Sequence, residues 1–346
     1  MKVNSILLRV VPVALVLMSA EMAHGQNTST LPLKVGPADS AATAQKFSYR
    51  ALGLVGSTDA SPLSRTVRSG APINAATVPS IPGPGFYPAD VTNPGNNPAI
   101  ETTEHHPIYV NRSPSHWGNV SGFLTDLGQS DFIHVLDQYV GSTASNRYTM
   151  GTSFIAEGYP IPANHTLQIS DILALVHAGA SVAGNGFGNL YHIFLPKGVD
   201  MCLSATDCYS PDNSSTFYFC AFHGSVTFTD AVGHAVFTVE PYQDVSGCSV
   251  PPTGTANSQL IDSTNNVLSH ETSEAISDPD LDAWWVQNLT FASGNEIGDL
   301  CIRSIQVGSN YYWDYGNVKL NGHLYTFQPE YSDQVHGCTY SPVGLE

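Results

Sequence analysis

Six cysteines, all lying between residues 202 and 338, are the strongest constraint on how this chain of 346 residues folds. Their number is even and none stands in the close pair spacing of a zinc finger, so we expect disulfides and no cysteine metal site. Six cysteines allow 15 pairings, and the sequence alone does not choose among them. Our provisional pairing closes progressively later loops: Cys202–Cys208, Cys220–Cys248 and Cys301–Cys338.

The first 25 residues have the features of an export signal. Lys2 gives a positive start, residues 10–18 form a short apolar run, and small residues follow at 23–25. No later segment approaches the roughly 18 apolar residues of a membrane span. We therefore expect residues 1–25 to be a cleaved signal peptide, the remaining chain to be secreted or periplasmic, and no membrane span.

The charge balance excludes one class of partner. The chain has a formal net charge of −17, and removing Lys2, Arg9 and Glu21, whose charges add to +1, leaves −18. Nucleic-acid-binding proteins contact phosphates through a basic surface, so we expect no nucleic-acid partner. Only 12% of the residues are charged, which is typical of an exported protein with a polar, uncharged surface rather than of a disordered acidic tail.

The composition and the apolar periodicity of the sequence change near residue 105. Residues 26–104 are rich in Pro, Gly, Asn, Ser and Thr and show little periodicity, so we interpret them as a propeptide, linker or loosely attached arm. Residues 105–346 carry regular apolar segments, enough for one sizeable core. Strand-like runs alternate there with helical runs, which predicts one α+β domain with a mixed sheet.

A late polar helix is predicted over residues 261–277. Ser263 or Thr264 can provide its N-cap, since hydroxyl side chains accept hydrogen bonds from the first free backbone N–H groups. Asp278 precedes a proline and is pushed out of helical geometry, so the helix ends there.

This helix carries the motif His-Glu-x-x-Glu. Glu274 lies about 40° from His270 around the helix axis and Glu271 about 100° from it, so His270 and Glu274 share a face. In the related His-Glu-x-x-His motif, the first and last residues hold a zinc ion and the intervening Glu acts as base. The alternative is that Glu271 and Glu274 form a solvated face and His270 is an ordinary core histidine.

A metal held through this helix needs a third protein ligand. Glu296 lies 22 residues after Glu274, in the run NEIGD that also contains Asp299. An Asn-Glu-x-x element about 20 residues beyond the helix supplies the third ligand in one branch of the zincins. We predict His270, Glu274 and Glu296 as ligands and Asp299 as the residue that orients a histidine or the base, although the two acidic roles are exchangeable.

The predicted ligand set also bears on the identity of the ion. One histidine and two carboxylates make the site formally neutral, which weakens the Lewis acidity of a dication, and oxygen-rich ligation suits harder ions. We predict a divalent ion, with Zn²⁺ first and Mn²⁺ or Ca²⁺ as alternatives. A further histidine would restore a zinc-type set, and the candidates are His223, His323 and His336.

Several runs resemble the EXORDIUM or phosphate-induced family of secreted proteins and its bacterial relatives. They are SHETSEAISDPDLDAWW with GNEIGDLC, HPIYVNRSPSHWGNVSGFLTDL, FYFCAFHG and FQPEYSDQVHGC. The resemblance covers about residues 105–340 and is weaker over 140–215, and Ala221 stands where the family often has glycine. It implies an extracellular protein connected with growth and with carbon or phosphate status, and it implies no particular reaction.

Carried over residue by residue, the resemblance implies one site and a bridge between Cys301 and Cys338. The implied site consists of His223, His270, Glu271, Glu274, Glu296 and Asp299.

The leading functional hypothesis is a secreted metal-dependent hydrolase with a zincin-like core. His270, Glu274 and Glu296 would hold the ion, Glu271 would activate water, and His223 would assist the oxyanion. A peptide bond is the expected substrate, by analogy with other zincins.

Two rival hypotheses use the same helix differently. The first is a non-enzymatic extracellular module that binds a cell-wall polymer or a surface partner. Trp284 and Trp313 would then lie on the binding surface, although aromatic residues at this density are more often part of a core. The second rival is a purely structural Ca²⁺ site, which would stabilise folding without turnover.

Overall fold

The computed structural model describes most of the chain beyond residue 90 and two short segments before it. The described ranges are 30–35, 44–53, 90–253, 255–287, 295–302, 304–307, 310–313 and 315–342. The predicted export signal lies outside them. Across these ranges, no helix combines the length and the apolar character that crossing a membrane requires.

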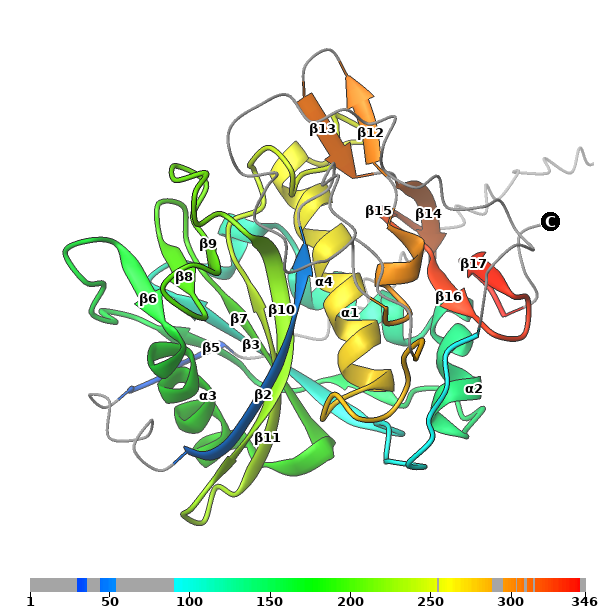
Figure 1. The fold of residues 1–346 in the computed structure, drawn as a ribbon, viewed down its shortest axis with the longest axis horizontal. Coiled ribbons are helices and arrows are strands. Elements are labelled where there is room, and N and C mark those ends of the chain that lie inside the picture. Colours follow the sequence, from blue (N-terminus) through cyan, green and yellow to red (C-terminus); the bar gives the residue numbers. More distant parts are fainter. Residues whose placement is uncertain are drawn as a thin grey trace, which may run out of the picture.

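A mixed sheet forms the frame of the fold (Figure 1). Within the described ranges it has eight strands, and β4 (Tyr148–Met150) pairs with β3 beside the main path. The order along the main path is β1 (Thr30–Pro32), β5 (Ser153–Ala156), β3 (Thr103–Val110), β7 (Asn189–Phe194), β11 (His234–Glu240), β10 (Phe219–Phe228) and β2 (Ala44–Gly53). Pairing is parallel from β1 to β11, whereas β10 is antiparallel to both of its neighbours. The predicted α+β class with a mixed sheet is confirmed.

The described parts of the segment 26–104 contribute to this sheet. Its strands β1 and β2 form the two opposite edges, and β3 begins at Thr103, inside the predicted arm. Most residues of β2 pair with β10, from Ala44 opposite Phe228 to Gly53 opposite Phe219. An edge strand is hydrogen-bonded on one side only, and β2 mixes apolar with polar and charged residues, so its composition gives little sign of its place in the sheet.

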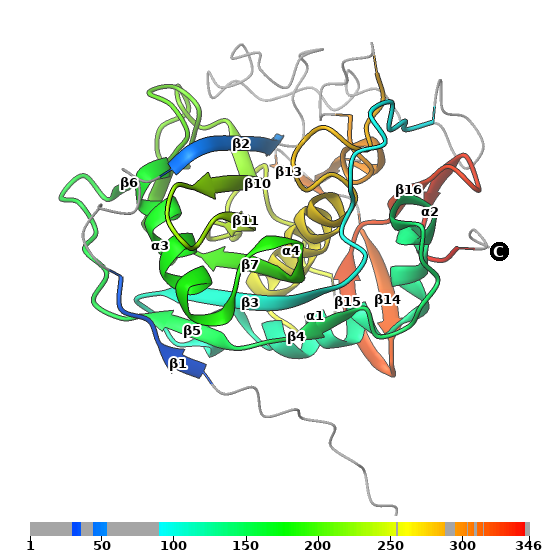
Figure 2. The same cartoon turned by 90° about the horizontal axis from the view of Figure 1, so that it is seen from below.

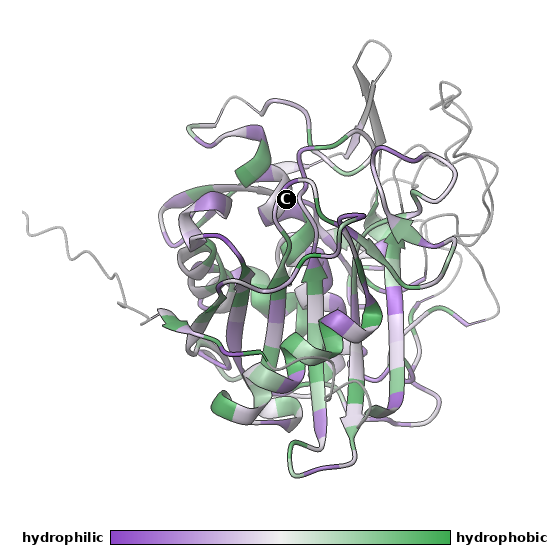
Figure 3. Cartoon of the chain, turned by 90° about the vertical axis from the view of Figure 1, so that its left-hand side faces the viewer, coloured by the Kyte–Doolittle hydropathy of each residue, from purple (hydrophilic) through white to green (hydrophobic). Residues whose placement is uncertain are grey.

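The sheet is covered on both faces by helices (Figure 2). Successive residues of a strand point to opposite faces. In β7, Tyr191 therefore shares a hydrophobic cluster with Ile172 of α3 (Ile169–Ala183), while Leu190 shares another with Ile276 of α4 (Gln259–Ser277). Figure 3 shows both hydrophobic and hydrophilic residues along the strands.

Smaller elements surround α4, which lies between the main sheet and the pair β14–β15. The short helices are η4 (Pro114–Trp117), α1 (Val120–Gly128), η5 (Asp131–Leu136), α2 (Asp137–Val140), η6 (Gly186–Gly188) and η7 (Asp299–Cys301). The remaining strands are β6 (Thr166–Gln168), β8 (Asp200–Cys202), β9 (Cys208–Tyr209), β12 (Ser304–Val307), β13 (Asn310–Trp313), β14 (Gly316–Leu320), β15 (His323–Phe327), β16 (Glu330–Ser332) and β17 (Gly337–Thr339).

The central helix α4 starts earlier than predicted. Ser258 is its N-cap and accepts a hydrogen bond from the backbone N–H of Ile261 at 3.3 Å. The predicted cap Ser263 lies inside the helix, where its hydroxyl donates to the carbonyl of Gln259 at 2.6 Å. The end at Ser277 is as predicted. Every residue from 262 to 277 is buried although many are polar, so their side chains must find partners inside the protein.

The predicted disulfide pairing is confirmed for all three bridges. Cys220–Cys248 anchors the start of β10, three residues before His223. Cys301–Cys338 ties η7, which carries Asp299, to β17. Two of the three bridges therefore fix segments that carry predicted site residues.

Candidate metal centre

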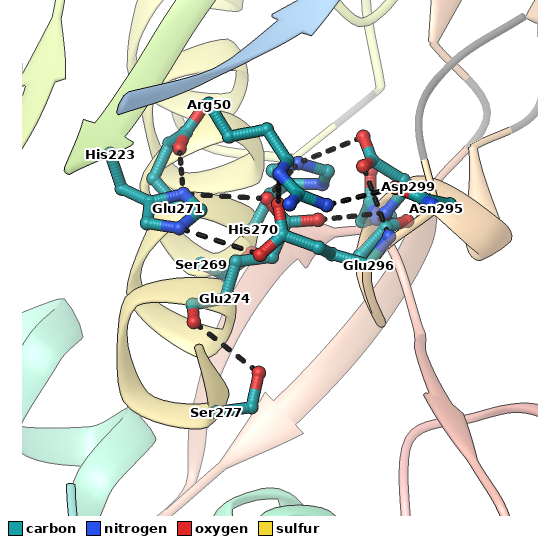
Figure 4. Close-up of polar contacts among 12 residues, drawn as sticks. Arg50, His223, Ser269, His270, Glu271, Glu274, Ser277, Asn295, Glu296 and Asp299 are labelled. Atoms are coloured by element: carbon teal, nitrogen blue, oxygen red, sulfur yellow. Dashed lines mark hydrogen bonds and ion pairs between the residues drawn. The ribbon is translucent and has the colours of Figure 1, made fainter. Parts of the chain in front are cut away.

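The structure brings all six predicted site residues together (Figure 4). Three come from α4, one from β10, and two from the segment 295–302 that includes η7. None is more than 2% exposed. They are His223, His270, Glu271, Glu274, Glu296 and Asp299.

One compact group consists of His270, Glu274 and Asp299. His270 Nε2 lies 3.2 Å from Glu274 Oε2 and 3.8 Å from Asp299 Oδ1. The other oxygen of Glu274, Oε1, accepts a hydrogen bond from the backbone N–H of Asp299 at 3.0 Å. This bond holds the Glu274 carboxylate so that Oε2 faces the histidine.

A second compact group consists of His223, Glu274 and Glu296. His223 Nδ1 lies 3.6 Å from Glu274 Oε2, and its Nε2 lies 3.5 Å from Glu296 Oε1. In addition, His223 Nδ1 contacts Glu271 Oε2 at 3.3 Å. Both groups use Glu274, so this residue is the common point of the centre.

The grouping differs from the ligand set favoured by the sequence. Glu296 lies beside His223 rather than beside His270, and Asp299 takes the place next to His270. The cause is local, because η7 starts at Asp299 and turns its carboxylate toward α4, whereas Glu296 points toward the sheet and pairs with Arg50. Of the two exchangeable roles, the distances favour Asp299 as the partner of His270.

The separations suit a bound cation. Ligand atoms about 2.1 Å from a tetrahedral ion lie roughly 3.4 Å apart, and the separations of 3.2 to 3.8 Å between these side chains fall around that value. His270 Nε2, His223 Nε2 and Glu296 Oε1 are fully buried without a hydrogen bond. Buried polar atoms normally have partners, and a cation between them would supply one.

The neutral ring of His223 also favours a bound cation. Burial lowers the pKa of His223 to about 4, so its ring is uncharged near neutral pH. One ring nitrogen of a neutral imidazole carries a hydrogen and the other presents a lone pair. Both nitrogens of His223 face carboxylate oxygens, so at least one lone pair points at an acid. A cation or an acid proton between them removes that repulsion.

Arg50 is a member of the centre that the sequence did not reveal. It lies on β2 directly opposite His223 of β10, and its Nε lies 3.0 Å from Glu296 Oε2. Its guanidinium also donates to Asn295 Oδ1 at 2.8 Å. Only the register of two strands that are distant in the sequence brings Arg50 here, and no local pattern signals it.

Three further buried carboxylates surround the six predicted residues. Glu240 and Glu330 both raise the pKa of Glu271, and Asp278 raises that of Glu296. All three are fully buried. Among the residues that the structure describes, seven buried carboxylates thus stand against one permanent cation, Arg50, and burying this excess of negative charge requires bound cations or protons.

The acidic groups respond differently to this crowding. Burial, with the charge of Glu274 next, raises the pKa of Glu271 well above its usual range and that of Asp299 to about 8. Burial opposes ionisation of Glu274 as well, but the neighbouring His270 outweighs it and lowers the pKa of Glu274. For His270, burial is likewise outweighed by Glu274, which raises the histidine's pKa. Without a metal, His270 and Glu274 form an ion pair beside acids whose pKa is raised.

A row of polar side chains crosses the sheet beneath α4. His192, Thr238 and His223 are consecutive partners in register on β7, β11 and β10. A hydrogen-bonded chain runs from His105 Nδ1 to His192, from His192 Nδ1 to Thr238 Oγ1, and from Thr238 to Glu240 Oε1, each step 2.9 Å. Polar residues interrupting apolar strands were the available signal for this row, and sequence reasoning did not use it.

The other candidate histidines take no part in the centre. The side chain of His323 is 71% exposed and its Nδ1 lies 2.7 Å from Asp126, while that of His336 is 66% exposed and pairs with Asp90 at 2.9 Å. Of the three candidates for a further ligand, only His223 reaches the centre.

The aromatic residues suggested as a binding surface serve packing instead. Trp313 is fully buried, donates its indole N–H to Gly247 at 3.0 Å, and lies edge-on to His270 with ring centroids 6.1 Å apart. Trp284 is half-buried and donates to the carbonyl of Tyr139 at 2.9 Å. Neither ring is available as an exposed platform in this structure.

Comparison of the chain with protein-family models, curated proteins and solved structures found no match. The resemblance to the EXORDIUM family therefore stays a prediction. The function has to be inferred from the residues of the centre.

Proposed function

We propose that this chain is a secreted metal-dependent hydrolase in which α4 is a zincin-like active-site helix. The observation that carries the proposal is the pair His270 and Glu274 on one turn of α4, 3.2 Å apart, with Asp299 beside them. One histidine and two carboxylates at such separations are a donor set for a divalent ion. Zn²⁺ is the first choice, and Mn²⁺ or Ca²⁺ are the alternatives.

Glu274 is the proposed central ligand. Either His270 and Asp299 or His223 and Glu296 complete the set, since each pair forms a compact group with it. When bound there, a divalent ion would polarise a substrate carbonyl and lower the pKa of a water molecule. Arg50 would then hold the outer oxygen of Glu296, which it contacts at 3.0 Å.

Glu271 is the proposed general base. Its Oε2 contacts His223 Nδ1 at 3.3 Å, and its Oε1 has no hydrogen-bond partner and can accept a proton. Burial raises the pKa of Glu271 well above its usual range in the metal-free protein. A nearby dication has the opposite effect on a carboxyl group, so metal binding would restore the carboxylate that a base needs.

His223 has a supporting role in this proposal. Because its ring is neutral, it donates one hydrogen bond and offers one lone pair. It can therefore either stabilise a developing oxyanion or act as a ligand. A peptide bond is the proposed substrate and a cell-wall polymer the alternative, both by resemblance to other proteins.

Access to the centre is closed in this structure. No more than 2% of any of the six residues is exposed, whereas 26% of the Arg50 side chain is. A substrate would therefore approach along β2, past Arg50. The same burial favours a second candidate function, a structural divalent ion in a non-enzymatic extracellular protein, because structural sites are closed while catalytic sites keep an open position.

Metal analysis and activity assays on the same preparation test both candidates. The full chain is purified without a metal-binding tag or chelator, its metal content is measured, and it is assayed on peptide and glycan libraries. Glu271→Gln is compared with Glu101→Gln, the same change at an exposed position. A hydrolase binds metal and loses turnover only in Glu271→Gln. Metal binding and EDTA-sensitive melting without turnover favour the structural ion, and a chain without metal rejects both.

A further inference from the structure

We infer that the centre takes two divalent cations, one on each compact group, with Glu274 as the carboxylate that both share. This two-ion inference rests on the proposed metal-dependent function. It goes beyond that function by stating how many ions bind and which residues hold each ion. The first group consists of His270, Glu274 and Asp299. The second group consists of His223, Glu274 and Glu296.

The two groups are complete and separate apart from Glu274. Each has its own histidine and its own second carboxylate, so each offers the three protein ligands that catalytic sites commonly use. The ligand atoms within each group all lie within 4.8 Å of one another, but the five residues do not form one such group. A single ion therefore cannot bind all five residues, and it would leave one of the two groups without a cation.

Both groups contain buried atoms that need a partner. In the first, His270 Nε2 has no hydrogen bond, and in the second neither His223 Nε2 nor Glu296 Oε1 has one. All three side chains are fully buried. An ion on only one group would satisfy that group and leave the orphaned atoms of the other in place.

The charge balance of the centre also favours two bound cations. Seven buried carboxylates and Arg50 give a net charge of −6 when all are ionised and the histidines are neutral. One dication reduces this to −4, whereas two reduce it to −2. The remaining charge is small enough to be neutralised by protons on Glu240 and Glu330, which lie outside both groups.

The backbone is shaped to bring the two groups together. A Cβ added at Gly298 would lie 2.5 Å from His270 Nδ1 and 2.9 Å from Glu274 Oε1, so only glycine permits this approach. The approach lets the N–H of Asp299 hold Glu274 Oε1, which leaves Glu274 Oε2 near both histidines at 3.2 and 3.6 Å. An oxygen in this position suits a carboxylate shared by ions about 3.5–4 Å apart, the spacing of two-metal hydrolases.

The number of ions is measured by native mass spectrometry of the full chain, stripped with EDTA and titrated with Mn²⁺ or Zn²⁺. Wild type is expected to take up two ions. His270→Ala and His223→Ala are each expected to retain one, while the exposed control His323→Ala retains two. Circular dichroism checks that each variant is folded, and the wild-type titration decides the stoichiometry if a variant is not.

Electron paramagnetic resonance of the Mn²⁺-loaded wild type tests whether Glu274 is shared. Two ions joined by one carboxylate give a spin-coupled spectrum that disappears in Glu274→Gln. Two uncoupled ions, or one ion in wild type, overturn the inference. One ion leaves the proposed hydrolase intact, whereas no bound ion rejects the two-ion inference and the proposed function together.

Discussion

Arg50 and His223 are direct partners in register on the antiparallel strands β2 and β10, and both reach the carboxylate of Glu296, one at each oxygen. The N-terminal segment thus completes a centre whose other members all lie beyond residue 220. Because Arg50 is the one permanent cation in the described part of this cluster of acids, the pairing of β2 with β10 is coupled to the charge of the centre.

Replacing Arg50 is expected to destabilise the metal-free protein more than the metal-loaded protein. Arg50→Met removes the partner of a buried carboxylate, and the expected loss is about 3 kcal/mol, the lower end for a buried pair because 26% of the Arg50 side chain is exposed. Bound metal supplies another positive charge near Glu296, so the loss should be smaller in its presence. Urea denaturation with EDTA and with Zn²⁺ measures both values. Lys46→Met on the exposed side of β2 is the matched control, and an equal loss in both variants would contradict the role given to Arg50.

The metal-free protein is expected to lose stability as the pH rises from about 6.5 to about 8. Burial raises the pKa of Asp299 and Glu240 to about 8, so their contribution is present below their unfolded pKa and lost as pH rises through about 8. The raised pKa of His270 acts in the same direction. The lowered pKa of His223 has the opposite effect, but only below about pH 6.5, where the unfolded imidazole becomes charged.

Urea midpoints measured across this range in EDTA test the sign. Zn²⁺ should flatten or reverse the trend, since binding releases protons and strengthens as pH rises. A metal-free protein whose stability rises between about pH 6.5 and pH 8 would show that the buried acids are not protonated in the folded state.

Gly298→Ala is expected to weaken metal binding and folding together. The added methyl group would lie 2.5 Å from His270 Nδ1, and moving the loop away costs about 1–3 kcal/mol. Gly188→Ala is the control, because a Cβ there meets nothing within 4 Å. Calorimetric titration with Zn²⁺ gives the affinity, and unchanged affinity in Gly298→Ala would mean that the close approach does not matter.

The disulfides should differ in their effect on the centre. Replacing Cys301 and Cys338 by alanine opens a loop of 37 residues, with an expected loss of about 4 kcal/mol in the chain-entropy model. Replacing Cys202 and Cys208 opens one of 6 residues, with an expected loss of about 2 kcal/mol. Only the first change frees η7, so metal affinity should fall about tenfold or more there alone. Equal affinities in the two double variants would contradict this.

Local patterns predicted what lies close together in the sequence. His270, Glu271 and Glu274 are within one and a half turns of helix, so their shared location follows from helical geometry. The disulfide pairing joins cysteines that are neighbours in sequence order, as the provisional pairing assumed, although the sequence alone did not exclude the other pairings. The α+β class follows from the alternation of strand-like and helical runs.

The positions that the sequence could not predict depend on strand pairing and packing between segments that are distant in the chain. Arg50 is placed only by the pairing of β2 with β10 across more than 170 residues, and Glu330 only by the course of the chain after η7. The choice between Glu296 and Asp299 depends on one short turn whose orientation is set by packing on α4. The start of α4 was missed because Ser258, Ser263 and Thr264 are equally good caps by type, and only tertiary contacts distinguish them.

The presence of a cation between α4 and η7 is tested most directly by anomalous diffraction from crystals of the metal-loaded protein. Data collected on both sides of the Zn²⁺ absorption edge should show a peak between His270 Nε2, Glu274 Oε2 and Asp299 Oδ1. A map without a peak beside Glu274, with these three side chains still clustered as here, would contradict the proposed metal centre and every function built on it.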